Sequence, residues 1–174
     1  MKCRQPSKDE RTQINRALDR WGAFDFFKHK SLIIQEVGTK KKVVCLVTGG
    51  GIEKAAQVMD PYSAGLAIGE LKKQFIPSIA GADLFARYGE RNKFYIVVGD
   101  QAEKLVLYGR DVMGESIVAA SDALDENELV IMLNKALEAI AIGRTRFAGS
   151  SLFQTGRATV TTIADAGYYL REEG

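Results

Sequence analysis

Short apolar segments separated by turn residues fill the chain from Phe94 onward, and this spacing constrains the fold more than any other feature. A single helical segment, Ala102–Tyr108, stands early in this part and ends at Gly109. We predict six strands, at Phe94–Val98, Ser116–Ala120, Leu129–Leu133, Ala139–Arg144, Ala158–Ile163 and Tyr168–Arg171. So many short strands leave exposed edges unless the sheet closes on itself. The pattern therefore predicts a small β-barrel.

The first half of the chain mixes helices with strands. Ser7 and Glu10 have the spacing of a capping box, and the apolar residues that follow recur at helical spacing up to Trp21, so a helix should end near Gly22. We predict strand pairs at Ser31–Val37 with Lys42–Val47 and at Tyr62–Ile68 with Gln74–Ile79, and further helices at Ile52–Met59 and Ala82–Tyr88. Hairpins of this kind predict an antiparallel sheet rather than repeated βαβ units.

The best boundary between the two halves is the polar, glycine-bearing segment 89–93, which lacks apolar periodicity. The sequence thus predicts an α+β protein of two domains. Residues 1–91 would form a mixed α/β domain with an antiparallel sheet, and residues 92–174 the barrel.

The composition excludes several classes of protein. Hydrophobic residues make up 46% and charged residues 26%, as in ordinary soluble proteins, and no run of about 18–20 apolar residues could span a membrane. The first residues lack the apolar core of a secretory signal, so we expect a cytoplasmic protein. Two cysteines, Cys3 and Cys45, and one histidine fit neither a disulfide framework nor a zinc finger.

The glycine run that ends at Gly51 follows an apolar strand and precedes a helix, which is the arrangement of some phosphate-binding loops. The dinucleotide pattern fails because Lys54 stands where its third glycine belongs, and the other phosphate-loop pattern is absent. We favour a simple turn over a nucleotide site.

No other motif predicts catalysis or a cofactor. His29 lacks a recognisable catalytic companion in the sequence, and Cys45 lies within an apolar strand, where it should be a small buried hydrophobe. An acidic cluster lacks calcium-loop spacing and should be a solvated turn, at Asp122, Asp125, Glu126 and Glu128. We therefore expect no catalytic residues, no metal site and no cofactor.

The charge distribution is uneven although the net charge is only +2. Residues 1–50 hold eleven basic against five acidic groups, whereas residues 101–138 hold three basic against eight acidic groups. Residues 139–164 contain no carboxylate but three arginines, Arg144, Arg146 and Arg157. The chain therefore has a basic first part and one acid-free stretch that bears arginines.

The arginine stretch begins as a strand in which Ile140 and Ile142 should share one face, with Arg144 and Arg146 continuing on that side beyond Gly143. A bulge at Gly143 would turn both guanidinium groups outward, where they could bind phosphate or stack on a base. The predicted RNA-binding residues are Arg144, Arg146, Arg157 and Lys135. The alternative is that these arginines are unrelated surface residues. The Lys40–Lys42 turn is a separate basic segment, which could contact RNA or simply protect a strand edge.

Several segments of the second half resemble a PUA domain, a small RNA-binding β-barrel. The most diagnostic are Ala139–Gly143, the strand that follows Gly156, and Asp165–Arg171. Arg4, Ser7 and Glu10 open the first helix of the first half. Further along the chain, beyond the boundary, come Ala102–Glu103, Leu107–Gly109 and Val112. Together, the order and spacing of these residues resemble the NIP-seven family of ribosome-biogenesis factors over nearly the whole chain.

This resemblance implies a non-catalytic protein, of the archaeal branch, that acts in pre-rRNA processing and assembly of the large ribosomal subunit. The implied partners are single-stranded U- or A/U-rich pre-rRNA and assembly or RNA-processing proteins that dock on the N-terminal domain. Basic residues just after the Ala139–Gly143 strand are the implied RNA contacts, here Arg144 and Arg146. The loop 147–155 departs from the family pattern because it carries no lysine, and Phe147 or Phe153 could contribute stacking instead.

Two other functions remain open at this stage. PUA domains also occur on RNA-modifying enzymes, although residues 1–92 show no catalytic motif. A translation-associated factor could carry the same domain beside a different N-terminal partner surface.

Overall fold

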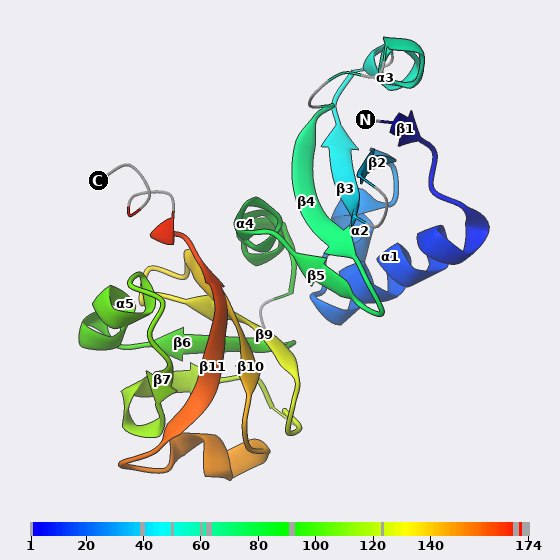
Figure 1. Cartoon of the computed structure of the whole chain (residues 1–174). Helices are drawn as coiled ribbons and strands as arrows, with labels where there is room; N and C mark the ends of the chain where they lie inside the picture. The colour runs from blue at the N-terminus through cyan, green and yellow to red at the C-terminus, as the bar shows by residue number, and fades with distance from the viewer. Residues whose placement is uncertain are drawn as a thin grey trace.

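The computed structural model describes residues 2–38, 41–49, 51–59, 61, 64–90, 93–122, 124–168 and 171. Two β-sheets, of five and six strands, form the frame of the molecule, and helix α4 (Ile79–Tyr88) lies between them (Figure 1). The predicted α+β class is confirmed. Within the described ranges no helix is both long and apolar enough to cross a membrane.

The N-terminal sheet is antiparallel throughout, in the order β1-β2-β3-β4-β5. Its strands are β1 (Lys2–Arg4), β2 (Ser31–Val37), β3 (Lys41–Val47), β4 (Leu66–Leu71) and β5 (Phe75–Pro77). Helices α1 (Lys8–Arg20) and α2 (Phe24–Phe27) connect β1 to β2, and α3 (Ile52–Met59) connects β3 to β4. The predicted antiparallel sheet is confirmed.

Helix α1 begins as its sequence predicts. The Ser7 hydroxyl accepts from the Glu10 amide at 3.3 Å, and the Glu10 carboxylate accepts from the Ser7 amide at 2.9 Å, which completes the capping box. The same carboxylate pairs with Arg4 at 2.6 Å and with Lys42 Nζ at 2.8 Å, so it connects β1, α1 and β3. These hydrogen bonds, above all the one from Arg4, hold the pKa of Glu10 far below its usual range.

The Glu10 interactions predict a specific acid sensitivity. A carboxyl group whose pKa is depressed in the folded state stabilises the fold above its unfolded pKa of about 4.5, and this contribution is lost as the pH falls toward the folded value. Glu10→Gln should lower the free energy of unfolding by about 1–3 kcal/mol at neutral pH and by less near pH 3, where part of the contribution is already lost. Urea unfolding at both pH values measures this difference. An equal loss at both would show that the Glu10 charge does not matter.

The C-terminal sheet has the order β7-β11-β10-β9-β6-β8 and curves into a nearly closed barrel (Figure 1). Its pairs are antiparallel except for β6 with β9, which run parallel. The strands are β6 (Tyr95–Val98), β7 (Val112–Met113), β8 (Ile117–Ala120), β9 (Leu129–Leu133), β10 (Ala139–Thr145) and β11 (Ala158–Asp165). Helix α5 (Asp100–Val106) and the short 3-10 helices η1 (Gly114–Ser116) and η2 (Gly149–Phe153) complete this half, and the predicted barrel is confirmed.

Some predicted elements are wrong or misplaced. The strand predicted at Tyr62–Ile68 starts at Leu66 and ends at Leu71, because its pairing with β3 decides its limits. The strand predicted at Tyr168–Arg171 is wrong. Both end residues are helical, and Arg171 turns back to pair with Asp165 at 2.9 Å, while residues 169–170 lie outside the described part. The predictions missed β1, α2 and β7, which are too short for periodicity to reveal.

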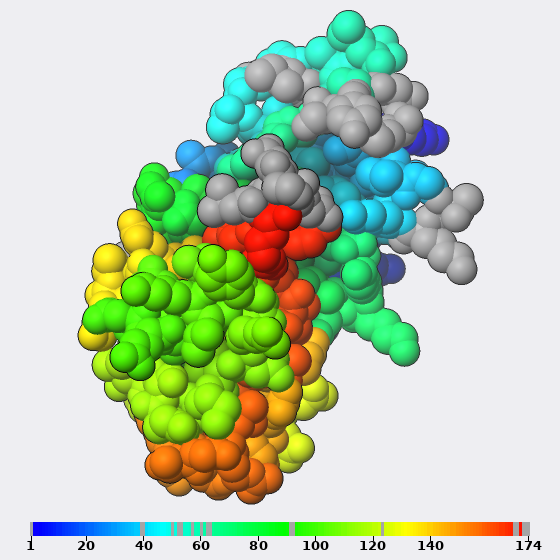
Figure 2. Space-filling model, turned by 60° about the vertical axis from the view of Figure 1, so that its left-hand side comes forward, coloured from blue at the N-terminus to red at the C-terminus, as the bar shows by residue number. Residues whose placement is uncertain are grey.

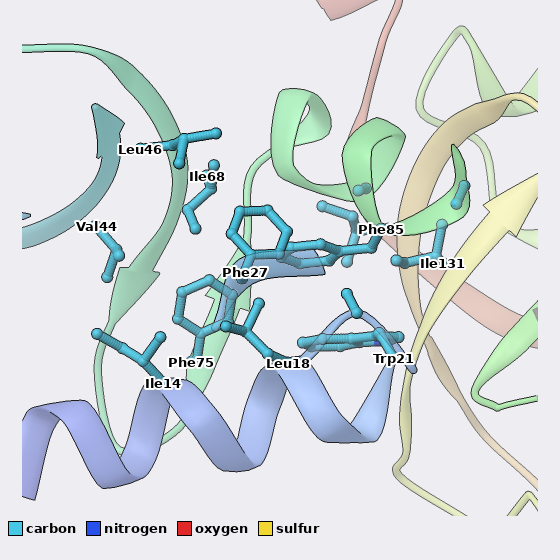
Figure 3. Close-up of a cluster of buried hydrophobic side chains, with 14 of the residues drawn as sticks. Ile14, Leu18, Trp21, Phe27, Val44, Leu46, Ile68, Phe75, Phe85 and Ile131 are labelled. Atoms are coloured by element: carbon cyan, nitrogen blue, oxygen red, sulfur yellow. The ribbon is translucent and has the colours of Figure 1, made fainter. Parts of the chain in front are cut away.

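Both sheets contribute to one buried cluster of apolar side chains. Trp21 stacks on Phe85 with ring centroids 5.7 Å apart, and Ile131 of β9 reaches the same cluster (Figure 3). The C-terminal half adds Tyr95, Leu129, Leu133 and Ile142 to it. A separate cluster that includes Val130 and Met132 fills the barrel. Because α4 packs along β10, and Leu129, Ile131 and Leu133 of β9 lie in the same cluster as Trp21 and Phe85, the two halves share a core. The domain boundary predicted between residues 91 and 92 lies outside the described residues and stays a prediction.

Candidate nucleic-acid interface

The end of β10 is shaped by Gly143. The pairing of β10 with β11 shifts register between Ile142 and Gly143, where Ile142 pairs with Ala164 and Gly143 with Thr162, so the extra residue of this bulge is Ile163 on β11 rather than a residue of β10. A Cβ atom on Gly143 would lie 2.8 Å from Val160 Cγ1 and 2.9 Å from the Thr161 carbonyl oxygen, so glycine permits the close approach of β11. The next residue, Arg144, pairs with Leu129 in the ladder with β9.

The predicted common face of Ile140 and Ile142 is wrong. Ile140 packs inside the barrel, whereas Ile142 belongs to the cluster shared with the N-terminal half. The reason is an irregularity in the pairing with β9 between Ala139 and Ala141, which breaks the simple alternation of the strand.

Arg144 and Arg146 are held by neighbouring groups. The Arg144 side chain is half-buried, and its Nη1 donates to the Asn127 carbonyl oxygen at 2.8 Å. Arg146 is exposed, donates from Nε to the Thr161 hydroxyl at 2.7 Å and forms an ion pair with Asp111. RNA would therefore compete with Asp111 for Arg146. Arg144 forms no ion pair with a described residue, so its charge is not balanced by an acidic side chain.

Arg157 stands just before β11, at the same end of the barrel. Its guanidinium carbon lies 4.7 Å from the centroid of the Phe147 ring, and Nη1 donates to Gln154 at 3.4 Å. Within the described residues it forms no ion pair. The ladder pairs Thr145 with Val160, so the fold brings Arg157 to the end of β10 that carries Arg144 and Arg146. We call these three residues the arginine end.

Lys135 does not join the arginine end. It lies in the turn between β9 and β10, where its Nζ pairs with Asp100 at 2.8 Å. This turn precedes β10, while Arg144 and Arg146 stand at the far end of that strand, roughly 20 Å away at about 3.4 Å per residue. Its role in RNA binding stays a prediction.

Arg20 is a basic residue near Arg144 that the sequence interpretation did not select. Its guanidinium carbon lies 3.9 Å from the centroid of the Phe94 ring, and the group pairs with Glu128. Burial, and secondly the charge of Arg144, lowers the pKa of Arg20, so the two arginines lie within electrostatic range. Because α1 and β10 are distant in the sequence, local patterns do not reveal that Arg20 lies near Arg144. The one relevant signal is the apolar stripe of α1 that ends beside Arg20.

The arginine end is less purely positive than the acid-free stretch of sequence indicates. Asp111 pairs with Arg146, and Glu128 pairs with nearby Arg20. Both acids come from other parts of the chain, which the fold brings to these strands. A third carboxylate, Glu115, accepts from the Gly156 amide at 3.0 Å, next to Arg157. Acidic groups therefore stand among the arginines, and the affinity of this surface for a polyanion should depend on few charges.

The other candidate residues offer no reactive arrangement. His29 is exposed, and Cys45 is buried, as predicted, with its thiol pKa raised by burial to about 11. The acidic residues of 122–128 hold no cluster suited to a metal in the part of the chain that is described. Gly50 and Lys40 lie outside that part, so the glycine run and the lysine turn stay untested.

Comparison with known proteins adds a family to this geometry. Residues 3–79 match the NIP7/UPF0113 pre-PUA domain, and residues 94–174 match the UPF0113 PUA domain. A UPF0113 protein of Archaeoglobus fulgidus is 32% identical over 99% of this chain and 97% of its own length.

Solved structures share the fold at low sequence identity. A conserved PUA domain protein from Thermoplasma acidophilum has a TM-score of 0.69 and 18% identity, and the hypothetical protein PH0734.1 from Pyrococcus horikoshii has 0.72 and 16%. Each match covers 98% of both chains. From the two domain matches and the full-length relative, we conclude that this chain belongs to the NIP7/UPF0113 family and carries its pre-PUA domain followed by a PUA domain.

Proposed function

We propose that this protein binds single-stranded RNA at the arginine end and acts, without catalysing a reaction, in pre-rRNA processing and assembly of the large ribosomal subunit. The observation that supports the proposal is the position of Arg144, Arg146 and Arg157 at the same end of the β10–β11 pair. Planar guanidinium groups suit phosphate oxygens and unpaired bases. The membership of the chain in the NIP7/UPF0113 family supports the ribosomal role, as the resemblance of its sequence implies.

Aromatic side chains near the arginine end favour single strands over duplexes. Phe147 is half-buried below Arg157, and Phe153 of η2 is 45% exposed. An exposed ring can stack on an unpaired base, whereas the bases of a duplex are stacked on one another. U- or A/U-rich segments are the expected targets by family resemblance.

The N-terminal domain, residues 1–91, would supply the surface for partner proteins. Val58 and Met59 at the end of α3 are 85% and 76% exposed, an apolar pair on a helix at the edge of the molecule (Figure 1). Exposed apolar groups of this kind suit contacts with proteins better than contacts with RNA. Residues 92–174 would hold the RNA, and we place the protein in the cytoplasm.

Sedimentation of ribosomal particles from the source cells tests the proposed role. The protein should sediment with precursors of the large subunit, and Arg144→Ala/Arg146→Ala should weaken this association. Association with mature subunits alone would instead indicate a translation factor. RNA modification that requires the protein would indicate an enzyme, and absence from all ribosomal fractions would contradict the proposal.

A further inference from the structure

A groove lies where the two halves of the molecule meet. Its volume is about 460 Å³, and its walls come from α1, the turn before β5 and the start of β9. Gln13 of α1 donates to the Lys72 carbonyl oxygen at 3.1 Å, which joins α1 to the turn. Phe75 and Leu129 provide the apolar part of the lining. Figure 2 shows the two halves as adjoining lobes. The volume of the groove lies in the range of pockets that bind small ligands.

Two buried donors at this groove lack a partner. Arg20 Nε and Trp21 Nε1 are the two buried side-chain nitrogen or oxygen atoms without a hydrogen bond among the residues that the structure describes. Both residues line the groove, and Trp21 is only 1% exposed. The indole cannot easily turn away, because it stacks on Phe85 and packs against Phe75 (Figure 3). Both nitrogens are covered by neighbouring groups, so a ligand in the groove meets the accessible part of Arg20, whose side chain is 31% exposed, rather than these two atoms.

The rim of the groove carries two cations that are available to an anion. Arg16 and Lys73 are exposed, and neither forms an ion pair with a described residue. The charge of Arg20 is balanced by Glu128, and Asp9 also lines the groove. With Arg16 and Lys73 counted, the lining of the groove has a net charge of about +1. A ligand that fits this lining has an anionic group for the rim and a flat apolar part for Phe75 and Leu129.

The groove also adjoins the arginine end. Leu129 lines the groove and is the ladder partner of Arg144. Directly opposed residues in a sheet lie about 5 Å apart, so a strand of RNA that contacts Arg144 can continue into the groove without a break. This continuity selects RNA over a free metabolite or a peptide carboxylate as the source of the anion.

We propose that the groove between α1 and β9 binds one nucleotide of the same RNA strand, with its phosphate at Arg16 and Lys73 and its base on the apolar side formed by Phe75 and Leu129. This inference rests on the proposed function, because the arginine end must hold the strand. It makes the N-terminal domain part of the RNA-binding surface as well as a surface for partner proteins.

The emission of Trp21, the single tryptophan of the chain, offers a direct test. Labelled single-stranded oligouridine is titrated into the intact protein, and its anisotropy is recorded together with Trp21 emission. Both signals should change at the same RNA concentration. Arg16→Ala/Lys73→Ala should weaken binding by about fivefold and reduce the salt slope by about 0.7, the value for one phosphate. Lys54→Ala, an exposed lysine on α3, is the control and should bind like the original protein.

The outcomes separate this inference from the proposed function. Absence of binding would overturn both. If binding requires Arg144 and Arg146 but Trp21 emission does not change, only the groove proposal is overturned. The same conclusion follows if the Arg16→Ala/Lys73→Ala variant binds RNA as tightly as the original protein. Circular dichroism of each variant shows that the exposed substitutions leave the fold intact.

Discussion

Replacing both Arg144 and Arg146 by alanine should weaken the binding of single-stranded RNA roughly 10- to 100-fold at low salt. Each guanidinium would lose one phosphate contact, and a contact of about 1 kcal/mol changes affinity by about fivefold, with cooperation in a strand adding to the effect. The three phosphate contacts of the arginine end alone should give log affinity against log salt a slope of roughly −2, and the loss of two of them should make the measured slope less negative by about 1.4. Fluorescence anisotropy at several salt concentrations measures both quantities.

A matched control separates this loss from a general loss of positive charge. Lys54→Ala/Lys104→Ala removes two exposed lysines, on α3 and α5, and changes the net charge by the same amount. We expect affinity close to that of the original protein. Equal losses in both double variants would mean that the whole protein attracts RNA without a defined site. The lysine variant should change the free energy of unfolding by less than about 0.5 kcal/mol. Arg144→Ala/Arg146→Ala removes the hydrogen bonds to the Asn127 carbonyl oxygen and the Thr161 hydroxyl and should cost about 1–2 kcal/mol, which leaves the protein folded in the binding assay.

Phe85→Ala should lower the free energy of unfolding by about 3–5 kcal/mol, the range for truncating a fully buried aromatic side chain. Phe85 is 0% exposed, stacks on Trp21 and packs edge-on against Phe27 at 5.6 Å. Its cluster includes Ile131 of β9, so the cavity would weaken the junction of the two halves as well as the N-terminal core. Urea unfolding followed by circular dichroism measures the loss.

The shared cluster also predicts how this protein unfolds. If both halves depend on one core, circular dichroism and Trp21 emission should report one transition in the original chain. Phe24→Ala is a fitting control because Phe24 is 37% exposed, and we expect it to cost far less. Two separate transitions, or a loss for Phe85→Ala no larger than for Phe24→Ala, would contradict a common core.

Local signals in the sequence predicted the elements whose limits depend on local chemistry. The capping box at Ser7 and the apolar stripe through Leu18 define α1 in the structure as they do in the sequence. The strand at Leu66–Leu71 was misplaced because its limits depend on β3, a partner that local patterns do not reveal. Likewise, the turn to Arg171 depends on its ion pair with Asp165.

The candidate site divides in the same way. Arg144 and Arg146 stand close together in the sequence, so their common location could be predicted, whereas the irregular residue beside them, Ile163, lies on β11. Asp111 and Arg20 could not be predicted, because they reach this surface from other elements. Their contacts are tertiary, and they decide how much of the arginine charge is available to RNA.

Binding of the intact protein to labelled single-stranded polyuridine and to duplex RNA, at two salt concentrations, tests the central claim most directly. The arginine end predicts tighter binding to the single strand, weakened by salt and by Arg144→Ala/Arg146→Ala. Absence of binding at low salt would contradict this claim. So would equal affinities for the single strand and the duplex, if the double substitution changes neither affinity.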